Sequence, residues 1–498
     1  MGNNQSCDVV IIGAGFAGIT ASRELSRRGY DVVVLEGRDR IGGRTWYKDD
    51  ALPGHSLELG GTWVHWFQPH AFAEISRYNL ELVETIGVSA PEIAATVTGG
   101  RRKSVPYEEA SAAIESLMEM VVQDAREVLE RPFEPFYHQD ALEVVDKLSI
   151  QDRIDGLDLT PEEKDLANGL WTAMGSAPCG DVGLVAALRW YALSGFDINA
   201  VFDTVGRYKL KNGTRSLIQA IADDSSAEVR LSTPVAAVEQ SDDGVVVTTR
   251  QGDTLRAQYV VVAAPLNTFG AIDFSPALSA AKQAGISEGQ PGRGSKAWVH
   301  VRGDLPKPFF AVAPENHLIN YVVTDKVLDD GQLLIAFGPE GADLNASDVD
   351  QVSAELQKLF GDLEVVATTG HDWASDEFSR GTWCMFRPGQ TTRLLAELQK
   401  PEGRVFFAGS DLANGWNGFI DGAIESGIRA DREIHARISG NPSRARSQVA
   451  PPSRNSDARE FRGEDLDMQG RDARRGLASR PAVHTDHQKV PIPTIAST

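Results

Sequence analysis

An α/β fold is predicted for this chain, and three observations support the prediction. The apolar run CDVVII (7–12) leads into GAGFAG (13–18), and a helical pattern then leads to a second apolar run, DVVVLE (31–36). Strand, glycine-rich turn, helix and strand in this order are typical of a Rossmann-type βαβ unit. Further apolar runs of strand length, GVVVTTR and YVVVAAP, lie far downstream. The predicted sheet is therefore discontinuous in the sequence.

The glycine-rich turn predicts a dinucleotide site. Gly13, Gly15 and Gly18 stand in G-x-G-x-x-G register. In this motif the first glycine permits a tight turn, the second lets the backbone approach a pyrophosphate, and the third lets helix and strand pack closely. The start of the helix offers free N–H groups to the phosphates, and Glu36 can accept hydrogen bonds from a ribose. These residues alone leave NAD and FAD both open.

The later elements follow from hydrophobic periodicity. A long helix is predicted over 107–130, with more helices towards residue 200, and another block of mixed helix and strand is predicted to start at 210–224. Strands follow it, and a second mixture of strands and helices begins at 294. A strand in GRVFFAGSDL precedes a last long helix over 418–438. Residues 441–498 are rich in Pro, Ser and Arg with few aromatics, so a disordered tail is predicted there.

Composition excludes several classes of protein. The 498 residues carry a formal net charge of −21, which argues against a nucleic-acid partner. The sequence contains no run of 18 or more apolar residues and no secretory leader, so no membrane span is predicted. Cys7, Cys179 and Cys384 are scattered without metal-ligand spacing. No metal site is therefore predicted, and a reducing, cytoplasmic location is expected.

Two further motifs carry a family resemblance. GRDRIGGRTW (37–46) follows Glu36 directly, and LELGGTWVH (57–65) comes soon after. Together with the glycine-rich turn, they resemble the flavin-containing amine oxidases, which include monoamine oxidases, polyamine oxidases and L-amino-acid oxidases. The bacterial nicotine and 6-hydroxynicotine oxidases are the branch that the chain resembles most. The resemblance spans residues 7–438 and implies FAD as the cofactor.

Residues of these motifs are expected to hold the cofactor. Arg44 and Arg38 bring positive charge to the pyrophosphate, while Gly43, Gly60 and Gly61 let backbone N–H groups approach it. The resemblance adds residues of the family's closing motif, VFFAGSDLANGWNGFIDGAIESG (405–427), and one strand residue. The full set of expected FAD contacts is Gly13, Gly15, Phe16, Ala17, Gly18, Glu36, Arg38, Gly43, Arg44, Gly60, Gly61, Thr62, Val235, Gly409, Ser410, Asp411 and Ile420.

The resemblance also assigns positions around the flavin. Asp411 stands where relatives usually carry Glu, near the ribityl or phosphate region, and the backbone of Val235 is expected at the adenine. The helix that begins near Phe419 is expected to aim its N-terminus at the pyrimidine end, where reduced flavin gathers negative charge. Thr382 stands where several monoamine oxidases carry flavin on a cysteine, and Cys384 is out of register. The resemblance therefore implies noncovalent FAD.

Three residues favour amine chemistry. Trp383 and Phe419 match the two aromatic positions that face each other before the flavin in this family. Such a cage excludes water, orients the amine α-carbon toward flavin N5 and favours the neutral amine. Lys296 matches the family lysine that holds a water against N5, where it supports oxygen reduction; strand alternation puts it on one face with Trp298 and His300. Plain core packing of the rings and a solvated strand position for the lysine are the alternatives.

The sequence therefore predicts an FAD-dependent amine oxidase. Hydride passes from the amine α-carbon to flavin N5, the imine hydrolyses, and dioxygen reoxidises the flavin with release of hydrogen peroxide. The expected fold is a discontinuous Rossmann-type FAD domain with a mixed sheet-and-helix (α+β) substrate domain. The FAD domain is expected at 1–83, 205–276 and 396–440, and the substrate domain at 84–204 and 277–395.

The sequence does not identify the amine. Candidate pocket residues are Thr172, Trp190, Tyr191, Phe202 and Tyr321, although core packing also explains each of them. A small-molecule amine and dioxygen are the expected partners, and a homodimer is left open. A flavin-dependent desaturase or dehydrogenase of a biosynthetic pathway, an L-amino-acid oxidase, and a flavin-fold protein without turnover are the alternatives.

Overall fold

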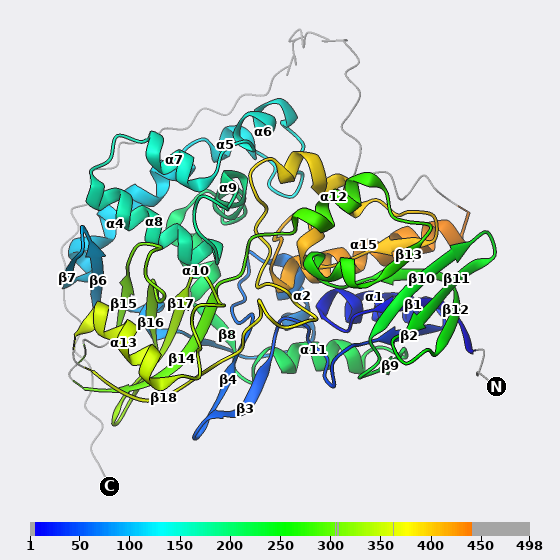
Figure 1. The fold of residues 1–498 in the computed structure, drawn as a ribbon, viewed down its shortest axis with the longest axis horizontal. Helices are drawn as coiled ribbons and strands as arrows, with labels where there is room; N and C mark the ends of the chain where they lie inside the picture. Colours follow the sequence, from blue (N-terminus) through cyan, green and yellow to red (C-terminus); the bar gives the residue numbers. More distant parts are fainter. Residues whose placement is uncertain (1–4, 304, 306–307, 362, 441–498) are drawn as a thin grey trace, which may run out of the picture. The chain divides into compact units, whose positions relative to one another are not determined.

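The computed structural model describes residues 5–440 except 304, 306–307 and 362. The chain divides into two units, Met1–Pro451 and Pro452–Thr498, and every described residue belongs to the first. The predicted tail, 441–498, lies outside the described residues. Two large sheets with helices packed on them make up the described part (Figure 1). The predicted α/β class is confirmed.

The first sheet has eight strands and lies on the right in Figure 1. In spatial order these are β13 (Asp273–Ser275), β10 (Val235–Ser241), β11 (Gly244–Thr249), β12 (Thr254–Val262), β1 (Gln5–Ile12), β2 (Val32–Leu35) and β9 (Glu228–Arg230), and β19 (Val405–Phe407) pairs with β12. Strand β1 is parallel to both β12 and β2, whereas β11 is antiparallel to β10 and β12. Segments distant in the sequence thus form one sheet, as predicted.

Glycines set the helix packing on this sheet. Helix α1 (Phe16–Arg27) joins β1 to β2, and a Cβ on Gly18 would lie 1.9 Å from the Gly13 carbonyl oxygen. Helix α15 (Ile420–Ile438) packs beside α1, where a Cβ on Gly427 would lie 2.5 Å from the Ala17 carbonyl oxygen. Both contacts are too close for any side chain. Helix α15 therefore lies directly against helix α1 of the N-terminal βαβ motif (Figure 1).

The second sheet has seven strands. In spatial order these are β18 (Glu364–Gly370), β14 (Ser295–Arg302), β17 (Gly331–Gly338), β16 (Tyr321–Leu328), β15 (Phe309–Val312), β6 (Ile93–Thr98) and β7 (Arg101–Pro106). All neighbours are antiparallel except β15 and β6. Every residue of β17 is buried. Helices from the middle of the chain lie above the sheet in Figure 1. Helix α13 (Val349–Phe360) packs on its other face.

Most remaining helices come from the middle of the chain. They are α2 (Pro69–Arg77), α3 (Ile86–Ser89), α4 (Tyr107–Val122), α5 (Ala125–Val128), α6 (Gln139–Val145), α7 (Ile150–Gly156), α8 (Pro161–Gly175), α9 (Leu184–Leu193), α10 (Ile198–Gly206), α11 (Thr214–Asp223), α12 (Ala280–Glu288), α13 (Val349–Phe360) and α14 (Ala396–Gln399). The other elements are two short ribbons, β3 (Tyr47–Leu52) with β4 (His55–Glu58) and β5 (Leu82–Glu84) with β8 (Tyr208–Leu210). Three short helical segments, η1 (Leu266–Ala271), η2 (Thr391–Leu395) and η3 (Ser410–Leu412), complete the described part. The single helix predicted over 107–130 is broken between α4 and α5.

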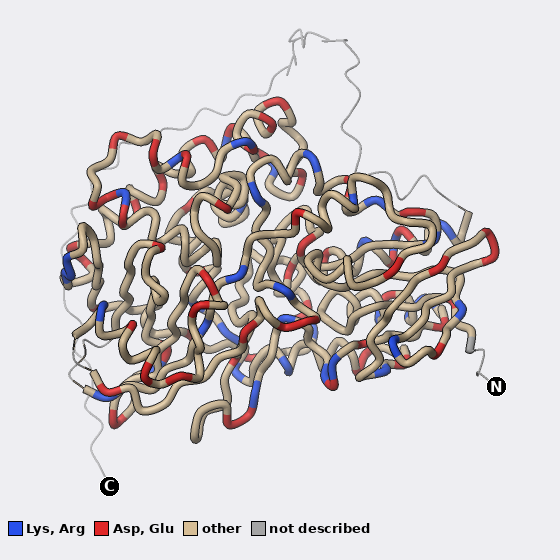
Figure 2. Tube along the Cα trace, in the orientation of Figure 1, with Lys and Arg blue, Asp and Glu red and all other residues tan. Residues whose placement is uncertain are grey.

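The two sheets can be compared with the two predicted domains. Strands of the first sheet come from segments assigned to the FAD domain, and strands of the second come from segments assigned to the substrate domain. The exact boundaries remain predictions. Charged residues of both signs are interspersed along the described chain (Figure 2). Among the described residues, no helix is both long and apolar enough to cross a bilayer.

Candidate functional site

A large cavity brings most of the predicted site residues together. Those that line it are Gly15, Phe16, Ala17, Gly43, Arg44, Gly60, Gly61, Thr62, Lys296, Trp383, Gly409, Ser410, Phe419 and Ile420. The other predicted residues, Gly13, Gly18, Glu36, Arg38, Val235 and Asp411, lie outside its lining. The cavity wall therefore combines the N-terminal motifs, strand β14 and the closing motif, which are far apart in the sequence.

The side of the cavity that is expected to hold the cofactor is largely main chain. Gly13 lies outside the lining but packs against it: it has φ +103°, and a Cβ on it would lie 2.8 Å from the carbonyl oxygen of Ala263, which lines the cavity. A Cβ on Gly60 would lie 2.1 Å from the Arg44 carbonyl oxygen. Helix α1 begins at this wall with Gly15 as N-cap and no side chain capping it. Uncapped N–H groups beside tightly packed glycines fit the pyrophosphate of a dinucleotide.

Glu36 supports the glycine-rich turn directly. Its carboxylate accepts hydrogen bonds from the backbone N–H of Ala14 at 2.7 Å and of Arg38 at 2.8 Å, and the side chain is buried. Each carboxylate oxygen can still accept a second bond, so the predicted ribose contact remains a prediction. The Arg38 guanidinium is paired with Asp376 at 2.5 Å and bonded to Ser379 at 2.7 Å. Through these contacts, Arg38 joins the loop that carries Asp376 and Ser379 to the GRDRIGGRTW motif.

Arg44 ties three motifs together. Its guanidinium donates to the Thr382 carbonyl oxygen at 2.6 Å and to the Ser410 hydroxyl at 2.7 Å, and it pairs with the Asp411 carboxylate. The other Asp411 oxygen accepts the Leu266 N–H at 3.0 Å. Asp411 therefore positions Arg44, which lines the cavity, and does not line it itself.

Arg40 is a functional residue that the sequence reasoning missed. It donates to the carbonyl oxygens of Ile41, Gly43 and Thr45 at 3.0 to 3.3 Å, and its guanidinium lies 4.8 Å from the Trp46 ring centroid. Burial lowers the pKa of Arg40 to about 10, with the neighbouring Arg38 acting in the same direction. Its position inside GRDRIGGRTW was the available signal. Arg40 holds the backbone of the loop that carries Gly43 in shape.

Lys296 is buried at the centre of the site. Its ammonium donates to the carbonyl oxygens of Glu58 and Gly60, both at 2.9 Å, and to the Thr62 hydroxyl at 2.5 Å. Burial lowers the pKa of Lys296 to about 7, while the negative charge of Glu58 opposes the shift. The Trp298 side chain lies on the same face of β14 as Lys296, and its indole N–H donates to the Glu58 carbonyl oxygen at 2.7 Å. The solvated-strand alternative for Lys296 is thus wrong, whereas the predicted water at N5 remains a prediction.

Aromatic side chains build the other side of the cavity. Trp383 donates its indole N–H to the Met174 carbonyl oxygen at 2.9 Å and packs edge-on against Phe337. The Phe419 ring meets Trp190 and Trp416 edge-on, with centroids 5.1 and 4.9 Å apart. Among the described residues that line the cavity, Arg44 and Lys296 alone carry a charge. Together with Trp383 and Phe419, the following side chains form the part of the cavity that we call the aromatic chamber: Trp63, Val88, Leu170, Ala173, Met174, Trp190, Phe202, Val205, Tyr321, Val323 and Phe337.

The pocket candidates from the sequence divide into two groups. Trp190, Phe202 and Tyr321 line the chamber, but Thr172 and Tyr191 do not. The Thr172 hydroxyl is engaged with the Cys179 thiol at 3.3 Å, and Tyr191 packs against a neighbouring ring. Adjacent positions on a helix face different directions. The sequence identified the right helices without resolving which face met the cavity.

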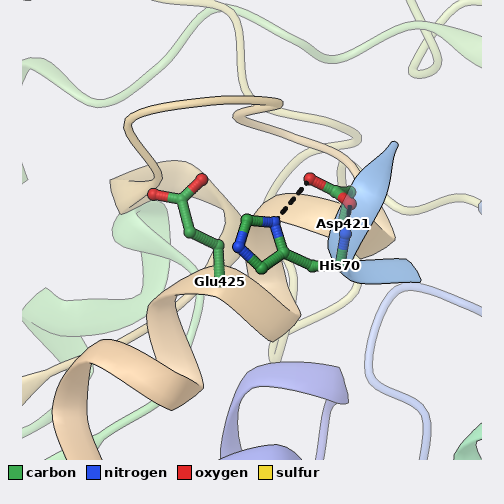
Figure 3. Close-up of side chains that lie close together, drawn as sticks. All are labelled: His70, Asp421 and Glu425. Carbon is green, nitrogen blue, oxygen red and sulfur yellow. Dashed lines mark hydrogen bonds and ion pairs between the residues drawn. The ribbon is translucent and has the colours of Figure 1, made fainter. Parts of the chain in front are cut away.

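A second cluster lies beside the cavity, where α2 meets the start of α15 (Figure 3). His70, Asp421 and Glu425 place potential ligand atoms within 4.8 Å of one another. Asp421 accepts the N–H groups of His70 and Ala71 at 2.6 and 2.9 Å, and Glu425 accepts two main-chain N–H groups. Burial alone would lower the pKa of His70, but its hydrogen bond to Asp421 and the nearby carboxylates raise it. The contacts join the two helices, and we assign no metal to them.

Known proteins resemble this chain over most of its length. A family model described as flavin containing amine oxidoreductase matches residues 16–435. Pseudooxynicotine dehydrogenase from Pseudomonas sp is 43% identical over 445 residues, covering 89% of each chain. (S)-6-hydroxynicotine oxidase from Paenarthrobacter nicotinovorans is 30% identical, covering 84% of this chain and 97% of the other. The solved structure of putrescine oxidase bound to putrescine is 25% identical with TM-score 0.74, covering 87% of this chain and all of that one.

Proposed function

This chain belongs to the flavin containing amine oxidoreductase family, and we propose that it oxidises an amine with noncovalently bound FAD, passes the electrons to dioxygen and releases hydrogen peroxide. One observation carries the proposal. A single cavity joins a glycine-rich backbone cradle, an aromatic chamber and a buried lysine. The family implies a flavin, and the uncapped start of α1 beside Gly15 fits the dinucleotide form of that cofactor.

The chamber is suited to a neutral amine. Bound flavin supplies a two-electron acceptor that takes a hydride from the amine α-carbon. Moving an unpaired ammonium into an apolar chamber costs several kcal/mol, so its walls favour the uncharged amine, which can release a hydride. Trp383 and Phe419 hold the amine in position and exclude water. The resulting imine takes up one water and separates into a carbonyl compound and an amine.

The same walls suggest the substrate class. A second amino group, as in a diamine, would need a carboxylate, and none lines the cavity among the described residues. A substrate carboxylate would need a free cation, but Arg44 is paired with Asp411. The Lys296 ammonium is already bonded to the carbonyl oxygens of Glu58 and Gly60 and to the Thr62 hydroxyl. We therefore favour a monoamine with an apolar or aromatic body over a diamine or an amino acid. The nicotine-related names of the relatives agree with this class.

The noncovalent attachment rests on Thr382 and Cys384. The Thr382 hydroxyl bonds to the Ser176 hydroxyl at 2.7 Å, and a hydroxyl forms no thioether. Cys384 is fully buried outside the cavity lining, and burial raises the pKa of its thiol. Acid precipitation of the purified protein should leave the yellow flavin in the supernatant. Flavin that stays in the protein pellet would contradict noncovalent binding.

The electron acceptor is tested separately. Pseudooxynicotine dehydrogenase, one of the relatives, is named a dehydrogenase, so a dehydrogenase that uses another acceptor is the second candidate. A panel of monoamines, diamines and amino acids should be screened for peroxide release in air and for reduction of an artificial acceptor without oxygen. Peroxide with monoamines supports the oxidase, whereas turnover only with the artificial acceptor supports the dehydrogenase. A cytoplasmic location and a homodimer stay predictions of the sequence.

A further inference from the structure

A buried carboxylate lies behind the lysine of the site. Glu58 ends strand β4 and is only 5% exposed. One carboxylate oxygen accepts the backbone N–H of Thr214, and the other has no hydrogen-bond partner among the described residues. A buried carboxylate oxygen without a partner is costly unless a positive charge lies nearby.

Two positive charges act on the Glu58 carboxylate, those of Lys296 and Lys209. The Lys296 ammonium and the Trp298 indole both donate to the main-chain carbonyl of Glu58 itself, at 2.9 and 2.7 Å. The lysine is therefore anchored on the same residue whose side chain carries the unpartnered oxygen. Glu58 raises the pKa of Lys296 through its charge, against the larger lowering effect of burial. Burial also raises the pKa of Glu58 itself, although the Thr214 N–H and the two nearby lysines oppose this.

A partly buried ion pair lies nearby. Lys209 of β8 is paired with Asp325 of β16, and the Lys209 ammonium lies 5.7 Å from the Trp298 ring centroid. The Lys296 ammonium lies 5.3 Å from the same centroid. Asp325 is engaged with Lys209, and of the two carboxylates Glu58 has the larger effect on Lys296. The groups facing Lys296 are Glu58, Thr62, Trp63, Lys209, Trp298 and Asp325.

We propose that Glu58 is a positioning residue that sets whether Lys296 carries a proton during turnover. The idea rests on the proposed oxidase function. Dioxygen takes up two electrons and two protons to become hydrogen peroxide, and a hydride from the amine carries two electrons and one proton. A second proton must therefore reach the reacting centre. The Lys296 ammonium can release that proton and recover it from solvent, whereas neutral Lys296 cannot.

The test measures Lys296 directly in the full-length protein. Lysine labelled with ¹³C at Cε reports protonation by NMR, and Lys296→Met identifies the signal. Glu58→Gln keeps an acceptor for the Thr214 N–H and removes only the charge. The protonation midpoint of Lys296 should fall by about one pH unit, a tenfold change in proton affinity. An unchanged midpoint in folded Glu58→Gln would overturn the proposal, because a purely structural Glu58 would not move it.

Two further variants keep the test decisive. Lys209→Met removes a like charge and should raise the Lys296 midpoint, so it tests the same electrostatics even where Glu58→Gln fails to fold. The double variant Lys209→Met with Asp325→Asn removes a neutral ion pair and serves as the matched control. It should leave the midpoint nearly unchanged. A shift in the control as large as that in Glu58→Gln would count against the assignment.

Kinetics then connects the midpoint to the reaction. In the oxygen reaction, the rate should fall with rising pH at the Lys296 midpoint, and Glu58→Gln should move that fall to lower pH by the same amount. A moved NMR midpoint with an unmoved rate profile would overturn the catalytic part of the proposal. If no amine is oxidised at all, the proposed function fails, while the NMR result still decides whether Glu58 controls Lys296.

Discussion

The two walls of the cavity are built in different ways. The wall that is expected to hold the cofactor is largely main chain from short motifs, and a Cβ on Gly60 would lie 2.1 Å from the Arg44 carbonyl oxygen. The substrate wall is side chains from α8, α9, α10, β16 and β17, and these make ring and van der Waals contacts. A backbone wall cannot change without moving its neighbours, but rings can be exchanged one at a time. We therefore expect the fold to constrain the cofactor more strictly than the substrate.

The largest expected effect comes from opening the substrate wall. Trp383→Ala should slow reduction by the best amine by about a hundredfold, because a substrate displaced by about 1 Å loses reactive alignment. The flavin-to-protein ratio should stay constant, since the cofactor wall is untouched. Anaerobic stopped-flow absorbance measures the rate, and Trp66→Ala, at a ring that is 47% exposed, is the control.

Phe419 sharpens this test. Phe419→Ala should also slow reduction, and the double variant should lose less than the two single losses combined, because both rings bound one chamber. Unchanged reduction in Trp383→Ala with flavin retained would falsify the cage, and with it the case for amine chemistry at this wall.

The second prediction concerns the lysine between the walls. The folded pKa of Lys296 is about 7 and its ordinary value is 10.5. Between these pH values the unfolded chain holds a proton that the folded chain lacks, so stability rises with pH across this window. The slope from this group is at most about 1.4 kcal/mol per pH unit. Lys296→Met should remove that slope, measured by denaturant unfolding at several pH values.

The contrast between the walls also explains what the sequence could predict. The βαβ unit, the family and the α/β fold depend on contiguous motifs, and all three are confirmed. The features that could not be predicted from the sequence depend on contacts between residues that are far apart in the chain. Glu58 lies in the motif LELGG, yet its importance depends on Lys296 and Lys209, which only the fold brings near it.

Local patterns also missed details of helices. The periodicity over 107–130 continues across Asp124, but Asp124 pairs with Arg153 of α7 and the helix is interrupted there. Thr172 lies on α8, a helix that lines the chamber, but Thr172 itself does not line it. Periodicity identifies a buried face without saying what covers it. The substrate wall was therefore the least predictable part of the site.

The third prediction tests the cofactor wall. Glu36→Ala removes the acceptor of two backbone N–H groups, at Ala14 and Arg38, and with them the support of the glycine-rich turn. Charge-assisted hydrogen bonds of this kind are each worth about 1.5 to 3 kcal/mol. The dissociation constant for FAD should therefore rise about tenfold or more while the fold persists. Titration of flavin-free protein with FAD measures it, and Asp39→Ala, at an exposed neighbouring carboxylate, should bind normally.

The smallest expected effect lies behind the cofactor wall, at His70. Its pKa is raised, because Asp421 and Glu425 outweigh the lowering effect of burial. The resulting stability is fully present below the ordinary pKa near 6.5 and is lost as pH rises through the higher folded value. The side chain is 31% exposed, so solvent screening limits the contribution to about 0.5 kcal/mol. His70→Gln keeps the main-chain bond to Asp421 and should lose that much stability at pH 5.5 but nearly none at pH 8.5. His138→Gln, which disrupts an exposed pair with Glu130, is the control, and an equal loss at both pH values would show that His70 acts by packing and not by charge.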